Sequence, residues 1–357
     1  MTNKPEFTID GRAIGPAHSP YLIAELSGNH NGDLDRALSL ISAAKEAGAD
    51  AVKLQTYTAD TITMDHDGPG FVLEDGLWEG RRLYELYQEA STPWEWHAAL
   101  FAHARALDLT VFSSPFDTTA VDFLEGLDAP AYKIASFEIV NLPLIERAAA
   151  TRRPIIMSTG MASTAEISEA IAVATAAGCP EIALLQCTSG YPAPAEDSNL
   201  RTIADLALRF ETVVGLSDHT LGTAVPVSAI ALGAAIVEKH FTHRRADGGP
   251  DAAFSLEPHE FARLCSDCRT AWSALGRVTY DVAPSEAASL KVRPSLYVVA
   301  DIAAGERLTP ENVRPIRPGY GLPPKHFKDV LGLRAKQTIA RGTPLNWNLL
   351  EDREDPS

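Results

Sequence analysis

Two histidines follow directly after short apolar segments of the chain, where loop residues begin. His219 ends the run Leu216-Ser217-Asp218-His219, and His240 ends the run Ile236-Val237-Glu238-Lys239-His240. If these runs are neighbouring parallel strands, both imidazoles lie at one edge of a sheet. Two imidazoles without thiolates suit a divalent metal ion of intermediate hardness. A histidine at a strand end more often has a structural role, so the rest of the chain must decide between these interpretations.

Three lysines occupy comparable positions. Lys53, Lys133 and Lys239 end apolar runs, whereas surface lysines are expected on helices. Lys53 and Lys133 could bind a phosphate or a carboxylate through charge-assisted hydrogen bonds, with help from nearby serine hydroxyls. These serines are Ser114, Ser136 and Ser217. For Lys239, an ion pair within the wall of the fold, with Glu238 or an acid on a neighbouring strand, is an equally good interpretation.

Four acidic residues add to this polar set. Glu25, Glu138 and Glu238 end or follow apolar runs, and Asp251 lies in the loop after the last of them. Their carboxylates could orient hydroxyl groups of a substrate or transfer protons. The combined pattern predicts a metal ion beside an anion-binding site.

The elements that must position these residues alternate in a regular order. Eight strand-like runs lie at residues 21–26, 51–55, 110–114, 131–134, 154–158, 182–186, 212–216 and 236–240. Segments of helical periodicity separate them, and Gly48, Gly178 and Gly233 mark helix ends. Eight such units in about 275 residues predict an α/β fold, a closed (β/α)8 TIM barrel whose active site lies at the C-terminal strand ends. A doubly wound open sheet is the alternative, but the glycine-rich dinucleotide fingerprint is missing.

The pattern changes after Leu275. Residues 1–275 are therefore predicted to form the catalytic barrel, 276–294 a linker, and 295–357 a small β-rich domain. Within the last segment, residues 301–308 and 338–345 form a weak internal sequence repeat, which indicates a pseudo-symmetric module. Such a short segment buries only a modest core by itself.

Composition excludes several classes of partner. The chain has 47 acidic and 31 basic residues, a formal charge of -16, which argues against nucleic acid or anionic membranes as partners. Neither a membrane-spanning run nor a secretion signal is recognisable, and the four cysteines form no disulfide framework. The Cys265 and Cys268 pair has CxxC spacing but lies in a helical pattern, which favours a structural role. We expect a soluble, cytoplasmic protein.

Several blocks of the sequence resemble one known family over nearly the whole chain. They include Asn29-His30-Asn31-Gly32, Val52-Lys53-Leu54-Gln55-Thr56, Tyr132-Lys133-Ile134-Ala135-Ser136, Leu216-Ser217-Asp218-His219-Thr220 and Glu238-Lys239-His240-Phe241-Thr242. In this order they resemble the sialic acid synthase family, and the C-terminal segment is similar to that family's antifreeze-like (SAF) domain. The resemblance implies a metal-dependent condensation of phosphoenolpyruvate with an open-chain amino sugar, which releases phosphate, and a domain-swapped homodimer.

The resemblance also implies roles for individual residues. The positions that match phosphoenolpyruvate-binding residues are Lys53, Ser114, Lys133, Ser136, Ser189 and Ser217. The positions that match the sugar side are Gln55, Tyr191, Glu238, Asp251 and, from the partner's SAF domain, Arg317. His219 and His240 match the ligands of Mn²⁺, for which Mg²⁺ or Co²⁺ are alternatives. Glu25 and then Glu138 are the candidates for proton transfer.

Details within the blocks favour one branch of the family. Ser189 stands in Cys187-Thr188-Ser189-Gly190-Tyr191-Pro192, where the neuraminate branch has asparagine, and other segments resemble the pseudaminate branch. That branch uses a diacetamido deoxy-hexose, 2,4-diacetamido-2,4,6-trideoxy-L-altrose, whose methyl group Phe254 or Tyr57 could cover. Pro294 departs from the family, which usually has an arginine there. Alternatives are an N-acetylneuraminate or legionaminate synthase, a TIM-barrel metallohydrolase with a sugar-binding module, and a non-catalytic sugar-binding protein.

Overall fold

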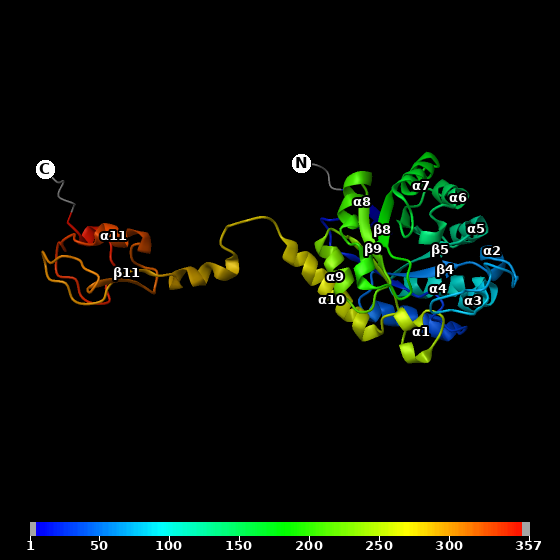
Figure 1. The fold of residues 1–357 in the computed structure, drawn as a ribbon, viewed down its shortest axis with the longest axis horizontal. Helices are drawn as coiled ribbons and strands as arrows, with labels where there is room; N and C mark the ends of the chain where they lie inside the picture. Colours follow the sequence, from blue (N-terminus) through cyan, green and yellow to red (C-terminus); the bar gives the residue numbers. More distant parts are fainter. Residues whose placement is uncertain (1–4, 352–357) are drawn as a thin grey trace. The chain divides into compact units, whose positions relative to one another are not determined.

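A closed barrel of parallel strands forms the larger part of the molecule. The computed structural model describes residues 5–351, and Figure 1 shows its ribbon. The barrel order is β10-β3-β4-β5-β6-β7-β8-β9. The strands are β3 (Tyr21–Glu25), β4 (Ala51–Thr56), β5 (Thr110–Pro115), β6 (Tyr132–Ile134), β7 (Ile155–Ser158), β8 (Ile182–Cys187), β9 (Val213–Asp218) and β10 (Ile236–His240). The predicted TIM barrel is confirmed.

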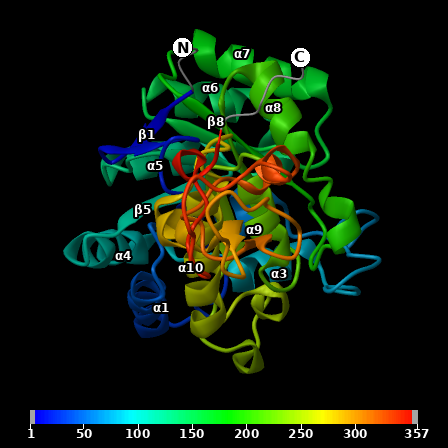
Figure 2. The ribbon, with the colours of Figure 1, turned by 90° about the vertical axis from the view of Figure 1, so that its left-hand side faces the viewer.

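Helices surround the barrel (Figures 1 and 2). They are α1 (Leu34–Glu46), α2 (Ala59–Ile62), α3 (Leu83–Ala90), α4 (Trp94–Ala106), α5 (Thr118–Gly126), α6 (Leu142–Ala150), α7 (Thr164–Ala176), α8 (Thr202–Phe210), α9 (Ala224–Ala231) and α10 (Pro258–Leu275). Asp33 caps α1 by accepting a hydrogen bond from the Arg36 backbone N–H. The sequence pattern did not predict α2 and α3, which lie in the long segment between β4 and α4.

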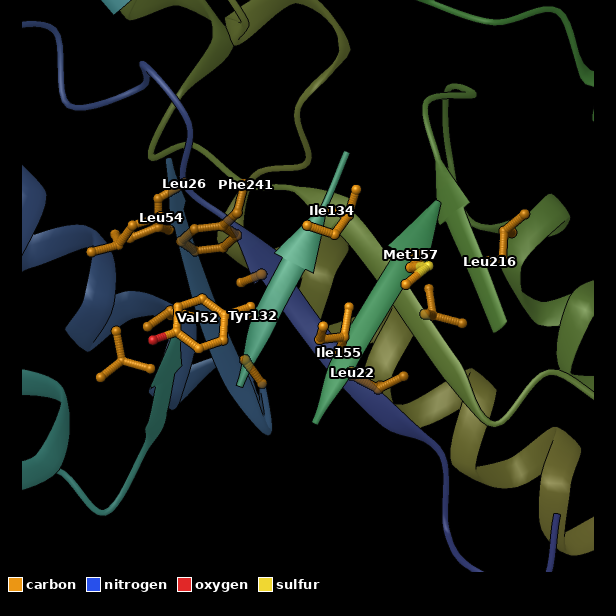
Figure 3. Close-up of a cluster of buried hydrophobic side chains, with 14 of the residues drawn as sticks. Leu22, Leu26, Val52, Leu54, Tyr132, Ile134, Ile155, Met157, Leu216 and Phe241 are labelled. Carbon is orange, nitrogen blue, oxygen red and sulfur yellow. The ribbon is translucent and has the colours of Figure 1, made fainter. Parts of the chain in front are cut away.

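Strand periodicity divides the core into two layers. In β3, Leu22 and Ala24 belong to the cluster between strands and helices, whereas Tyr21 and Ile23 belong to the cluster inside the barrel. Figure 3 shows the outer cluster, where Leu22, Val52 and Tyr132 are labelled. This alternation decides which strand-end residues point into the barrel.

A short hairpin adds to the interior core. Strands β1 (Phe7–Ile9) and β2 (Arg12–Ile14) pair antiparallel, and Phe7, Ile9 and Ile14 are buried with the first residues of the barrel strands. The hairpin therefore packs at the N-terminal end of the barrel, opposite the expected site. The hairpin was not predicted from the sequence, because three-residue strands are too short for their periodicity to be recognised.

Two buried histidines should make the stability of the barrel depend on pH. Burial lowers the pKa of His30 and of His97 to about 4. His97 Nε2 lies 2.9 Å from Thr56 Oγ1, and its Nδ1 lies 3.1 Å from the Pro93 carbonyl oxygen. These imidazoles remain neutral in the folded chain at pH values where an unfolded histidine, with a pKa of about 6.5, is protonated.

The free energy of unfolding should therefore decrease as pH falls from about 6.5 towards about 4. The contribution of His97 should decrease by about 2 kcal/mol between pH 7 and pH 5. Urea denaturation at both pH values checks this, with His97→Gln as the comparison because glutamine cannot be protonated. An equal pH dependence for the wild type and the variant would contradict the prediction.

A second compact unit follows the barrel. Contacts divide the chain into Met1–Gly276 and Arg277–Ser357. The second unit contains strands β11 (Ser295–Val298) and β12 (Val313–Ile316), a single-turn helix α11 (Phe327–Val330), and a 3-10 segment (Pro284–Val292) in the predicted linker. Ile302 and Ile339, at equivalent positions of the two segments of the repeat, exchange backbone N–H···O bonds of 2.9 and 2.8 Å. The internal repeat thus corresponds to reciprocal pairing around one core.

No helix within residues 5–351 is long and apolar enough to cross a membrane.

Candidate active site

Two lysines and two glutamates from different strands meet inside the barrel. Lys53 Nζ lies 2.5 Å from Glu25 Oε2 and 3.7 Å from Glu238 Oε1, and Lys133 Nζ lies 3.5 Å from the same Glu238 oxygen. All four side chains are at most 6% exposed. Strands β3, β4, β6 and β10 position them. Glu25 ends β3 as predicted, whereas the other three residues lie within their strands rather than at the ends. The two ammonium groups and the two carboxylates balance each other in charge.

Burial and neighbouring charges shift the pKa values of this cluster. Burial raises the pKa of Glu25, and the negative charge of Glu238 adds to this, whereas Lys53 opposes it. Burial lowers the pKa of Lys133, against the attraction of Glu238. Such opposed shifts in one enclosed cluster are characteristic of sites that bind charged groups or transfer protons.

Neutral polar groups surround the charged cluster. Lys53 Nζ donates to Ser114 Oγ at 3.2 Å, and Ser217 Oγ donates to Glu238 Oε1 at 3.2 Å. Gln55 Nε2 donates to Glu25 Oε1 at 3.0 Å. Glu238, predicted from the resemblance on the sugar side, thus lies among the residues predicted to bind phosphoenolpyruvate.

Gln55 connects this cluster to a further acid. Its Nε2 also donates to Ser27 Oγ at 3.1 Å, and Ser27 donates to Asp251, which is 9% exposed. Ser27 belongs to the polar residues that follow the first barrel strand in the sequence, but no role was predicted for it.

Gly160 separates two of the predicted serines. The Gly160 N–H lies 3.2 Å from Ser136 Oγ. A Cβ at position 160 would be 2.6 Å from Ser189 Oγ and 2.7 Å from Ser136 Oγ. Only glycine therefore permits both hydroxyls at this place, and the structure brings the two serines of β6 and β8 loops together.

The two histidines lie side by side. Their ring centroids are 5.4 Å apart. His219 Nδ1 lies 2.9 Å from the Thr188 carbonyl oxygen, which makes Nδ1 the protonated nitrogen and leaves Nε2 as the free acceptor. Burial lowers the pKa of His240 well below its ordinary value, and so do the nearby cationic groups. A neutral imidazole is the form that binds metal ions.

His240 Nδ1 is buried and has no hydrogen-bond partner among residues 5–351. Such an orphaned nitrogen beside a second imidazole fits a cation bound by two protein ligands. Within the same residues there is no cluster of three or more His, Cys, Asp or Glu side chains placed to hold a metal ion. Water and substrate oxygens would have to supply the remaining ligands.

Aromatic rings enclose the histidine pair. Tyr191 lies 4.4 Å from His219 and Phe254 lies 4.8 Å from His240, measured between ring centroids. Trp78, for which no role was predicted, lies 5.6 Å from Tyr191 between ring centroids. Tyr57, by contrast, packs against Tyr87 and Phe116. Phe254 rather than Tyr57 therefore borders the histidines.

Other predicted residues take different positions. Burial raises the pKa of Glu138 to about 7, and its Oε2 has no hydrogen-bond partner among the described residues. Cys187, for which no role in the site was predicted, has its Sγ 3.9 Å from His219 Nδ1 and 3.9 Å from Ser189 Oγ. Lys239 does not join the other two lysines, because it pairs with Asp218.

Arg317 is exposed in the second unit, just after β12.

Comparison with known proteins agrees with this architecture. The NeuB family model matches residues 40–280, and the SAF domain model matches residues 293–351. The chain belongs to the NeuB family. The antifreeze-like domain expected from the sequence is thus confirmed, as is the expected sialic acid synthase resemblance.

Individual relatives of the NeuB family cover almost the whole chain. The pseudaminic acid synthase of Helicobacter pylori is 44% identical over 93% of this chain and 98% of its own. The N,N'-diacetyllegionaminic acid synthase of Legionella pneumophila is 36% identical over 94% and 96%. The crystal structure of N-acetylneuraminic acid (sialic acid) synthetase from Leptospira borgpetersenii is 32% identical, with a TM-score of 0.71 over 80% of this chain and 95% of that one.

Proposed function

We propose that the chain is a pseudaminic acid synthase, which condenses phosphoenolpyruvate with open-chain 2,4-diacetamido-2,4,6-trideoxy-L-altrose. The observation that carries the choice of sugar is the ranking of relatives. Pseudaminic acid synthases of Helicobacter pylori and Campylobacter jejuni are 44% and 42% identical, whereas diacetyllegionaminic acid synthases are 36% and 37% identical. The enclosed lysine cluster supports a trianionic substrate such as phosphoenolpyruvate.

Lys53 and Lys133 hold the phosphate and carboxylate of phosphoenolpyruvate in this proposal. The anion replaces the interactions that Glu25 and Glu238 make with the two ammonium groups, and serine hydroxyls add hydrogen bonds. The methylene carbon forms a bond to the aldehyde carbon, water adds to the former enol carbon, and its C–O bond to phosphate breaks. The lysines stabilise the negative charge of the departing phosphate.

His219 and His240 would hold the divalent cation, proposed to be Mn²⁺. When bound, the cation supplies Lewis-acid polarisation of the aldehyde. The side chain of His219 is oriented by its bond to the Thr188 carbonyl, and Phe254 packs against the ring of His240. Phe254 also offers an apolar surface for the sugar's methyl group.

The carboxyl groups of Glu138 and Glu25 transfer protons in this proposal. Glu138, with its pKa raised to about 7, is partly protonated at neutral pH and can donate a proton. Glu25, whose pKa burial raises, can accept one from the attacking water. The orphaned Oε2 of Glu138 leaves that oxygen available to the substrate.

The test of this function is phosphate release with each candidate sugar. We expect rapid turnover with phosphoenolpyruvate and the diacetamido-trideoxy-altrose, and slow turnover with N-acetylmannosamine or the legionaminate precursor. Robust turnover only with one of the latter sugars would overturn the pseudaminate assignment. Activity without phosphoenolpyruvate would instead indicate a metallohydrolase.

Gly160→Ala should weaken phosphoenolpyruvate binding with little effect on stability. The new methyl group displaces the hydroxyls of Ser136 and Ser189, which can rotate away, and its 3.1 Å contact with Ser136 Cβ requires only a shift of a few tenths of an ångström. The loss of about one hydrogen bond should raise the Michaelis constant for phosphoenolpyruvate about ten-fold. Gly126→Ala is the control, because a Cβ there has no atom within 4 Å. An unchanged Michaelis constant in Gly160→Ala would contradict the role of these serines.

We further propose a homodimer in which Arg317 of one copy contributes to sugar binding in the other. The support is the resemblance to the family and the exposed position of Arg317. Arg317→Ala should raise the Michaelis constant for the sugar and leave that for phosphoenolpyruvate unchanged. Mixing Arg317→Ala with His240→Ala should restore some turnover, and the absence of rescue would argue against a swapped dimer. The cytoplasmic location remains a prediction.

A further inference from the structure

An ion pair lies behind the two histidines, on the other side of the barrel wall. Lys239 Nζ contacts the Asp218 carboxylate, and the two side chains are 0% and 2% exposed. The residues are direct partners in the register between β10 and β9. Because side chains alternate along a strand, both point away from the barrel interior, into the layer that the helices occupy.

This ion pair also fixes the turn that follows His219. Asp218 Oδ1 accepts hydrogen bonds from the Thr220 backbone N–H at 3.1 Å and from Thr220 Oγ1 at 2.9 Å. Lys239 Nζ donates to the Thr220 carbonyl oxygen at 2.5 Å. The pair thus constrains Asp218 and Thr220, the two residues that flank His219 in the chain. His240 directly follows Lys239.

The structure therefore gives Lys239 a different role from Lys53 and Lys133, which converge on Glu238 inside the barrel. A fully buried ion pair contributes little net stability compared with apolar residues of the same size, because both charges lose their hydration. Such a pair does, however, hold the ends of β9 and β10 in a fixed position relative to each other. The groups behind metal ligands often serve this purpose, since they orient the ligands.

We propose that Asp218 and Lys239 are positioning residues that set the separation and direction of His219 and His240. This inference rests on the proposed role of the two histidines as ligands of a divalent cation. In this inference the pair does not contact the substrate. Its loss should therefore change activity only by weakening the binding of the cation.

Calorimetric titration of the metal-free protein with Mn²⁺ tests the proposal. Lys239→Met should weaken Mn²⁺ binding about 10- to 100-fold and reduce kcat, with a small effect on the Michaelis constant for phosphoenolpyruvate. Asp218→Asn retains an acceptor for Thr220 and should lose less affinity. Arg269→Met is the control, because Arg269 contacts Asp50 ahead of β4, at the opposite end of the barrel; its Mn²⁺ affinity should be that of the wild type.

The double variant Asp218→Asn/Lys239→Met separates positioning from stability. It leaves no unpaired buried charge, so its stability to urea should recover relative to Lys239→Met, while Mn²⁺ binding should remain weak. Wild-type Mn²⁺ affinity in both Lys239→Met and the double variant would overturn the inference alone. A wild-type protein that binds no Mn²⁺ would overturn the proposed metal role as well.

Discussion

Replacing His240 with alanine should lower the rate of condensation by about a thousand-fold or more, since Lewis-acid activation contributes several kcal/mol to the transition state. His240 ends β10, and its ring contacts His219 and Phe254 rather than the apolar core. The fold should therefore be retained, with an unchanged circular dichroism spectrum. Steady-state turnover and metal content by mass spectrometry measure the two effects.

His243→Ala is the matched control for this prediction. His243 lies in the same loop region but is only partly buried, and its Nε2 lies 2.9 Å from Ser39 Oγ outside the site. This variant should bind Mn²⁺ and turn over normally. Near-normal turnover of His240→Ala after chelation would show that the histidine pair does not hold a required metal.

Lys53→Met should both abolish phosphoenolpyruvate binding and destabilise the barrel. Lys53 is the cation between Glu25 and Glu238, and its removal leaves the buried Glu25 carboxylate without a cationic partner and Glu238 with Lys133 alone. Loss of one member of a buried ion pair costs about 3–5 kcal/mol. Turnover should decrease at least about a hundred-fold, because a charge that stabilises the departing phosphate is lost.

The destabilisation of Lys53→Met should depend on pH in a defined direction. Without the lysine, the pKa of Glu25 rises further, so the folded chain binds a proton that the unfolded chain releases. The variant should therefore regain stability as pH falls through the raised pKa towards about 4.5. Urea denaturation at several pH values measures this.

Two further variants make the result specific. Lys53→Met/Glu25→Gln removes the unpaired charge of Glu25 and should recover part of the stability but none of the activity. Lys45→Met removes a partly buried lysine outside the site, which donates to the Asp108 carbonyl oxygen, and both properties should be unchanged. Equal instability of Lys53→Met and the double variant would contradict the buried ion pair.

The order of elements was predictable because local signals specify it. Each apolar run ends at polar residues, and glycines end the helices. Short segments of the sequence are therefore sufficient to predict the alternation of strand and helix. The ends of the strands were less predictable. Ser217 and Asp218 lie within β9 rather than after it, because backbone pairing with β10 extends the strand past its apolar residues.

The sequence by itself determined that polar residues gather at one end of a parallel barrel, including Lys53, Lys133, His219 and His240. Only the tertiary structure decided which of these share a space. Lys239 and Lys53 have the same local surroundings, yet one faces the helices and the other the interior, because side chains alternate along strands whose register depends on packing. The shifted pKa values of Glu25 and Glu138 likewise depend on burial, a property that no residue has before the barrel closes.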